Sequence, residues 1–194
     1  MRNALLKIMA SAALLTAGAA LAFAAAPVPR KSAEFTFTDP SGKQVSLSSY
    51  KGKVVAFAFM YTTCPHCQRE AQMLTKLQRE LGPRGFQALG AAFNFMPADT
   101  TATRAATTSK FIQDFGIGFP VGHASQESVQ AYLGISVMDR YVVPQIAVID
   151  KNGMVVKQSD PTLGSEELQT EATLRALIEK LLVSGAPVSK AATK

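Results

Sequence analysis

The 194-residue chain has little of what disulfide frameworks, metal sites and nucleic-acid surfaces are made from. It contains two cysteines, two histidines and no tryptophan. A small secreted domain held together by disulfides uses more cysteines than this. A structural zinc site normally needs four ligands, and beyond the two thiols only His66 and His123 are available, so zinc is a poor interpretation. The net charge of +6 comes without a Lys/Arg block, and nothing indicates a nucleic-acid partner.

Both cysteines lie in one Cys-Pro-His-Cys motif, residues 64–67, directly after the apolar run 54–60. Such a run is typical of a strand covered on both faces, and an amphipathic helix is expected from the motif to about Leu81. A cysteine at a helix N-terminus is stabilised as the thiolate, because unpaired N–H groups and the helix dipole favour negative charge. A cross-link around two residues adds little stability. The motif therefore predicts a redox-active dithiol.

The N-terminus is typical of a secretory signal. Arg2 and Lys7 precede an uncharged apolar stretch, residues 8–23, and small residues follow, so we predict a signal peptide over residues 1–24. Its removal deletes two basic residues and no acid, so the net charge falls from +6 to +4. The alternative is a retained membrane anchor, although the apolar stretch is shorter than the ~20 residues of a spanning helix. A cleaved signal predicts a periplasmic or otherwise extracytoplasmic protein without stable membrane insertion.

The remaining chain has the length of one domain. We predict an extended leader over residues 25–33, one domain over 34–184 and a flexible tail over 185–194. The expected strands are 35–38, 44–47, 54–60, 86–93, 146–149 and 154–157. The expected helices run from the motif to Leu81, after about Thr103 through Phe115, over 126–133, and from Ser165 onward. This order predicts an α/β three-layer sandwich, with a mixed central sheet between helices and an N-terminal β-hairpin.

The order of elements, the position of the motif and a proline before the next-to-last strand resemble the thioredoxin superfamily. More narrowly, residues 46–70 (SLSSYKGKVVAFAFMYTTCPHCQRE) and 141–156 (YVVPQIAVIDKNGMVV) are similar to the extracytoplasmic TlpA/ResA-type, or redoxin, thiol-disulfide oxidoreductases. The resemblance covers about residues 34–182. It implies a thioredoxin-like fold, no cofactor, and client proteins with cysteines or disulfides. It also implies a redox partner protein, which we expect to be membrane-bound.

The resemblance also implies roles for individual residues. Cys64 is expected to be the exposed nucleophile and Cys67 the resolving thiol. Pro65 suits the first helical turn, where its missing N–H costs nothing.

The substrate platform is expected at Pro144, which the resemblance implies to be cis and close to the cysteines. The backbone of Val143 would then pair with an extended substrate segment. The alternative is an ordinary edge-strand proline. In the thioredoxin superfamily a tryptophan often precedes the first cysteine, and Thr63 takes that position here. We therefore include Thr63 among the expected substrate-binding residues.

Two departures from related proteins restrict the chemistry. Ala58 replaces the buried acid that thioredoxin carries six residues before its first cysteine, and the sequence identifies no substitute. The peroxidatic pattern Pro-x-x-x-Thr/Ser-x-x-Cys fails at Phe57 and Tyr61, which argues against peroxiredoxin activity.

The direction of electron flow depends on His66. A histidine there could donate a hydrogen bond or a positive charge to the Cys64 sulfur, and a stabilised thiolate makes the couple more oxidising. Cys-Pro-His-Cys with Val143 before the proline resembles the DsbA-type oxidants, although their inserted helical domain has no counterpart here. The sequence thus slightly favours oxidation. The alternative is a TlpA/ResA-like reductant, for example in cytochrome c maturation.

Two other classes compete with this interpretation. Cys64, Cys67 and His123 could bind Cu(I) in a Sco-like metallochaperone. The spacing of the cysteines counts against this, because three residues separate them in Sco-type proteins and two separate them here. The simpler interpretation of His123 is a solvated loop histidine. A binding module that has lost turnover is opposed by the intact Cys64, Cys67 and Pro144.

Overall fold

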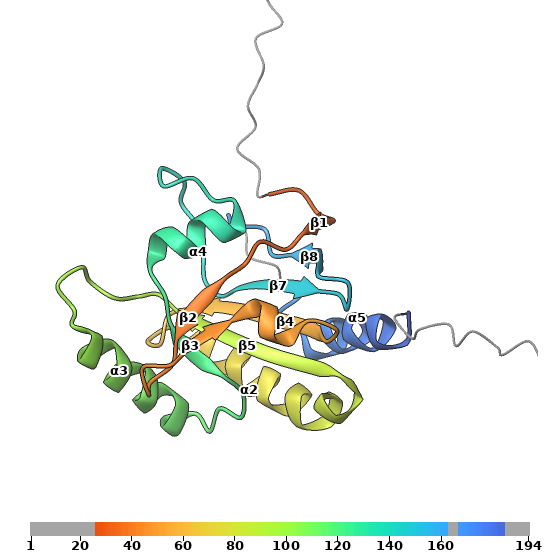
Figure 1. Cartoon of the computed structure of the whole chain (residues 1–194), viewed down its shortest axis with the longest axis horizontal. Helices are drawn as coiled ribbons and strands as arrows, with labels where there is room; N and C mark the ends of the chain where they lie inside the picture. The colour runs from red at the N-terminus through yellow and green to blue at the C-terminus, as the bar shows by residue number, and fades with distance from the viewer. Residues whose placement is uncertain (1–25, 163–166, 185–194) are drawn as a thin grey trace, which may run out of the picture.

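A mixed sheet organises the part of the chain that the computed structural model describes, residues 26–162 and 167–184 (Figure 1). Its strand order is β1-β8-β7-β4-β5-β6-β2-β3. The bounds are β1 Arg30–Lys31, β2 Thr36–Thr38, β3 Gln44–Ser46, β4 Val54–Met60, β5 Phe86–Ala92, β6 Val121–His123, β7 Gln145–Ile149 and β8 Met154–Gln158. Strands β4, β5 and β6 pair in parallel, and the other pairs are antiparallel.

Helices cover both faces of this sheet. They are α2 Pro65–Leu81, α3 Thr101–Asp114, α4 Gln126–Leu133 and α5 Glu171–Ser184, with 3-10 helices η1 Leu47–Tyr50 and η2 Gly82–Arg84. Figure 1 shows α2 and α5 on one side of the sheet and α4 on the other. Buried residues of α2, α3 and α5 share one core cluster, and those of α4 join the second. The predicted three-layer α/β arrangement is confirmed.

Strand β4 is buried over its whole length, as its apolar run predicts. Its alternate residues point to opposite faces of the sheet. Ala56 and Ala58 face the α2 side, where their small side chains allow the helix to pack closely. Phe57 and Phe59 face the other side and meet Phe35 in an aromatic group, with ring centroids 5.1 Å apart for Phe35 and Phe57. The central strand is therefore fixed from both sides.

The structure adds two strands that the sequence pattern did not predict. Strand β1 lies within the predicted leader and pairs with β8 at the sheet edge. Strand β6 has only three residues, too few to show a period of two. Helix α3 begins earlier than expected, at Thr101, because the Thr100 hydroxyl accepts a hydrogen bond from the Thr103 N–H at 3.1 Å.

The ends of the chain are only partly described. The predicted helix start at Ser165, the signal over residues 1–24 and the tail over 185–194 lie outside the described residues. Within the described part, the last helix starts at Glu171, after a turn in which Leu168 is buried. No helix in residues 26–162 or 167–184 is long and apolar enough to span a membrane.

Candidate active site

Cys64 stands at the junction between β4 and α2, where the sequence places it. A turn holds it there, because its N–H donates to the Tyr61 carbonyl at 3.2 Å and its carbonyl accepts from the Gln68 N–H at 3.0 Å. Cys64 is the N-cap residue of α2, and Pro65 occupies the first helical position. Both cysteines are free thiols, Cys64 half-buried and Cys67 buried. The pair thus combines one accessible and one enclosed sulfur.

Cys67 lies on the buried face of α2, in contact with the core. Burial raises the pKa of its thiol far above the ordinary value, and the hydrogen bond with Cys64 adds to the increase. The Tyr61 N–H, which donates to the Cys67 sulfur at 3.4 Å, only partly offsets this. Cys67 therefore stays protonated until a neighbouring group accepts its proton.

The loop before β7 reaches the cysteine pair from across the sheet. The Cys64 thiol donates to the Val143 carbonyl at 3.9 Å, and the Val143–Pro144 peptide bond is cis. Val143 is half-buried and Pro144 is buried, whereas Thr63 is exposed beside the cysteines. These three predicted substrate-binding residues thus lie at the same end of the sheet as Cys64, and Val143 contacts its sulfur.

A polar clamp that the sequence did not reveal fixes the loop before Cys64. The Asn94 side-chain oxygen accepts from the Thr62 N–H at 3.0 Å, and the Gln68 amide donates to the Thr62 carbonyl at 3.0 Å. Thr62 is buried, and a buried backbone N–H or carbonyl needs a hydrogen-bond partner. Asn94, which follows β5, and Gln68 in α2 supply both partners. Asn94 had no signal beyond its place after a buried strand.

Glu70 is the main site residue that sequence reasoning missed. It is 3% exposed, and neither of its carboxyl oxygens has a hydrogen-bond partner in the described structure. Burial raises its pKa well above the ordinary value, and the negative charge of the Cys64 thiolate raises it further. The signal was available, since Glu70 follows Cys67 by three residues and precedes Leu74 by four, on the apolar side of α2. A buried acid is therefore present despite Ala58.

A small cavity connects Glu70 with the surface of α2. Its volume is about 190 Å³, and Glu70, Met73 and Gln169 line it together with His66 and Arg69. The exposed His66 contacts Arg69, one turn further along α2. Its Nδ1 lies 3.0 Å from an Arg69 guanidinium nitrogen, which donates to it. The described hydrogen bonds include none between His66 and Cys64, so the hydrogen bond that the sequence hypothesis allowed is not made in this structure.

His123 is not the solvated loop residue that the sequence favoured. It is 7% exposed within β6, with its ring 5.9 Å from that of Phe95. Burial lowers its pKa, and the charge of Arg104 lowers it further. His123 lies in β6, and Cys64 follows β4. Strand β5 lies between these two strands, so they are about 10 Å apart. In the described residues, no group of three or more His, Cys, Asp or Glu could hold a metal. The Cu(I) ligand set is therefore not assembled.

A dithiol at the start of the helix after a central strand, facing a proline loop, defines a thioredoxin-like redox domain. Residues 28–158 match the model of the AhpC/TSA family, and the chain belongs to that family.

Known relatives agree with this class. The thiol-disulfide oxidoreductase ResA of Geobacillus thermodenitrificans is 27% identical over 136 residues, which cover 70% of this chain and 71% of ResA. A Xenopus laevis protein named as a probable glutathione peroxidase 8-B is 24% identical over 163 residues, covering 77% and 74%. A crystal structure of a thiol:disulfide interchange protein from Chlorobium tepidum superposes with a TM-score of 0.63 at 25% identity, covering 81% of this chain and 99% of that one. The chain is thus a homologue of thiol-disulfide oxidoreductases with the thioredoxin-like fold.

Proposed function

We propose that the protein reduces disulfides of client proteins outside the cytoplasm, with Cys64 as nucleophile and Cys67 as resolving thiol. The observation that carries this proposal is the asymmetry of the pair. Cys64 is half-buried at the N-terminus of α2 and contacts the Val143 carbonyl, whereas Cys67 is enclosed by the core. The signal-like N-terminus and the ResA relative support an extracytoplasmic thiol-disulfide oxidoreductase.

The exchange proceeds in two displacement steps. The Cys64 thiolate attacks one sulfur of the client disulfide, that disulfide breaks, and one client thiolate leaves. Cys67 then loses its proton and attacks the Cys64 sulfur, which releases the second client thiolate and leaves a Cys64–Cys67 disulfide. The client gains two electrons and two protons. A redox partner protein, which we propose to be membrane-bound, restores the dithiol by the reverse exchange.

Glu70 is suited to pass the Cys67 proton on to solvent: its raised pKa holds a proton in the resting site, and once that proton has left, the carboxylate can accept the proton of Cys67. Its carboxylate is buried on the same side of α2, three residues from Cys67, and has no competing hydrogen bond in the described structure. Because burial raises its pKa towards that of a thiol, proton transfer between the two groups is easier than to an ordinary surface carboxylate. The cavity beside Met73 and Gln169 gives the proton a route to solvent.

The surroundings of the pair support reduction over the oxidation that the sequence slightly favoured. A strongly oxidising couple needs a reduced form stabilised as the thiolate. His66, the residue expected to supply that stabilisation, instead accepts a hydrogen bond from Arg69. Burial favours the protonated thiol at Cys67. Peroxide reduction of the peroxiredoxin kind is opposed by Phe57 and Tyr61, which stand in the positions of the peroxidatic pattern.

Trapping of clients tests the assignment of roles. Cys67→Ser is expected to accumulate mixed disulfides through Cys64, because the resolving thiol is missing. Cys64→Ser, the matched control, should trap few. Equal, negligible trapping by both variants would refute the proposed roles.

The equilibrium of the Cys64–Cys67 couple with a glutathione buffer tests the direction. A value near that of thioredoxin, roughly −270 mV, supports reduction, and a value near the roughly −120 mV of DsbA overturns it. Insulin reduction measured on the same preparation shows whether turnover is retained.

A further inference from the structure

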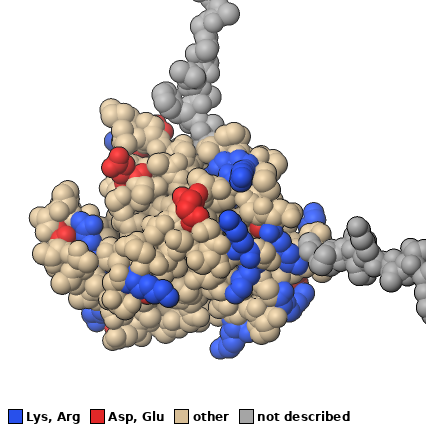
Figure 2. Space-filling view, viewed as in Figure 1, with Lys and Arg blue, Asp and Glu red and all other residues tan. Residues whose placement is uncertain are grey.

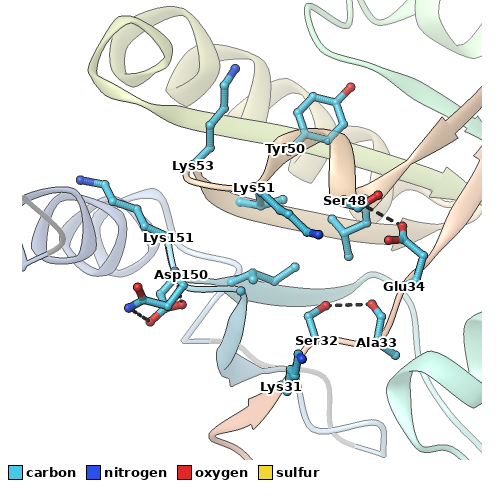
Figure 3. Close-up of a pocket in the computed structure, with 15 residues that line it drawn as sticks. Lys31, Ser32, Ala33, Glu34, Ser48, Tyr50, Lys51, Lys53, Asp150 and Lys151 are labelled. Atoms are coloured by element: carbon cyan, nitrogen blue, oxygen red, sulfur yellow. Dashed lines mark hydrogen bonds between the residues drawn. The ribbon is translucent and has the colours of Figure 1, made fainter. Parts of the chain in front are cut away.

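A pocket of about 250 Å³ lies at the other end of β4 from Cys64 (Figure 3). Three segments enclose it: the connection between β1 and β2, the η1 helix with the turn after it, and the turn between β7 and β8. Val55 near the start of β4 lines the pocket, whereas the cysteine pair follows the end of this strand. We propose that this pocket binds a small monocarboxylate with a short apolar body.

The floor of the pocket is apolar. Leu47, Val55 and Ile149 line it and are 8%, 2% and 3% exposed. All three belong to the core cluster around Phe35 and Phe57, so the pocket opens directly onto the packed interior. Water in contact with such a floor is displaced favourably by hydrocarbon. The body of the ligand is therefore apolar.

The rim of the pocket carries more positive than negative charge. Four lysines and two acids line it: Lys31, Lys51, Lys53, Lys151, Glu34 and Asp150. Figure 2 shows lysine and arginine side chains gathered on the right half of the viewed face. An excess of two positive charges around an apolar floor favours an anionic head group on the ligand.

The two acids are already engaged with the backbone of their own segments. One Glu34 oxygen accepts from the N–H groups of Phe35 at 3.3 Å and Ser48 at 3.1 Å. One Asp150 oxygen accepts from the N–H groups of Asn152 at 2.9 Å and Met154 at 2.8 Å. These carboxylates shape the walls of the pocket.

Two of the lysines are available to a ligand. Lys53 donates to the Gln87 side chain at 3.2 Å and Lys151 to the Leu182 carbonyl at 2.6 Å, and Figure 3 shows both directed away from the cavity. Lys51 instead extends across the mouth towards Glu34 in the same view. The Lys31 and Lys51 ammonium groups donate no hydrogen bond to any described residue. The carboxylate of the ligand is therefore placed at the mouth, beside Lys51.

The size of the pocket limits the apolar body. Pockets for drug-sized ligands measure roughly 300–1,000 Å³, so this pocket holds a short hydrocarbon group. A free short-chain carboxylate has this chemistry, and so does the C-terminal residue of a peptide that ends in an apolar side chain. Both sources share a carboxylate next to a hydrocarbon group.

Titration of the reduced, folded protein with hexanoate, followed by amide NMR, tests the proposal. Saturable shifts are expected at residues around Leu47 and Asp150. Hexanamide, which lacks the charge, and inorganic phosphate, which lacks the apolar body, should each bind at least about ten-fold more weakly. Equal binding of hexanamide and hexanoate, or of phosphate and hexanoate, would overturn it.

Variants around the pocket separate specific binding from general attraction to a basic protein. Lys51→Gln should weaken hexanoate binding about three-fold, as expected for an exposed ion pair, and Lys31→Gln with Lys51→Gln about ten-fold. Lys180→Gln, an exposed lysine of α5, is the matched control and should change nothing. Ala33→Phe on the exposed rim should block the pocket without disturbing the core. Binding unchanged in both the Lys31/Lys51 double variant and Ala33→Phe would refute the site.

Two further measurements show which kind of carboxylate the pocket prefers and whether the pocket acts independently of the cysteine pair. A peptide ending in Leu with a free carboxylate, compared with its amide, shows whether a chain end binds more tightly than hexanoate. Carboxylate-dependent binding of either ligand supports the proposal, and absence of both overturns it. Insulin reduction should be the same in wild type and Lys51→Gln, because the pocket and Cys64 lie at opposite ends of β4.

Discussion

Replacing Glu70 by Gln changes how the stability of the protein depends on pH. In the unfolded chain Glu70 loses its proton around pH 4.5, whereas in the folded protein burial holds its pKa well above that value. Between these two values the folded state binds one proton more than the unfolded state. The stability of the wild type therefore falls as pH rises through this window, by at most about 1.4 kcal/mol per pH unit.

The full slope is expected because no group in the described part of the chain compensates the charge of an ionised Glu70. Glu70 is 3% exposed and neither oxygen has a hydrogen-bond partner among the described residues, so ionisation carries the whole desolvation cost. Gln has nearly the same shape and does not titrate. Any loss caused by the buried amide is independent of pH, so the difference between variant and wild type isolates the carboxyl.

Urea unfolding at pH 5, 6, 7 and 8, with both proteins kept reduced, measures this difference. The stability of Glu70→Gln relative to wild type should increase with pH. Glu127→Gln, an exposed acid in the first turn of α4, is the control and should leave the wild-type slope unchanged. Parallel stability curves for Glu70→Gln and wild type would show that the carboxyl is not a buried acid with a raised pKa.

Two further predictions concern the framework around the site. A methyl group on Gly122 would lie 2.3 Å from the Thr38 carbonyl oxygen, so Gly122→Ala should lose about 1–3 kcal/mol in urea unfolding. Gly118→Ala, whose added methyl meets only a side chain, should lose less, and equal losses would contradict the close approach. Asn94→Ala leaves the buried Thr62 N–H without its acceptor and should cost about 1–3 kcal/mol. It should also slow insulin reduction, and unchanged stability and rate would refute the clamp.

Elements with long or strongly patterned sequences were predictable. The unbroken apolar run of β4 and the amphipathic pattern of α2 are each long enough to identify the type of element. The junction that carries Cys64 follows from these two, because one element ends and the next begins within a few residues. Strand β6 and the edge strand β1 were missed, since two or three residues show no period and depend on partners distant in sequence.

The environment of each site residue depended on contacts between distant segments. Glu70 carried a helical signal for burial, but that no described residue forms a hydrogen bond with its carboxyl could be known only once α2 had packed on the sheet. His66 and His123 show the same limit. The sequence could not show that the His66 imidazole contacts Arg69 and not the Cys64 sulfur. Nor could it show that His123 is buried, because its burial depends on segments distant in sequence.

The sequence by itself determined the dithiol, its place at a strand-to-helix junction and the α/β layers, because these follow from local order and from side-chain periods. Only the tertiary structure decided that Asn94 and Gln68 fix the loop before Cys64, that Val143 faces its sulfur, and that Glu70 is buried with no hydrogen bond from the residues in 26–162 and 167–184. The physical reason is that burial and hydrogen bonding depend on distances in space, and segments far apart in the chain set those distances.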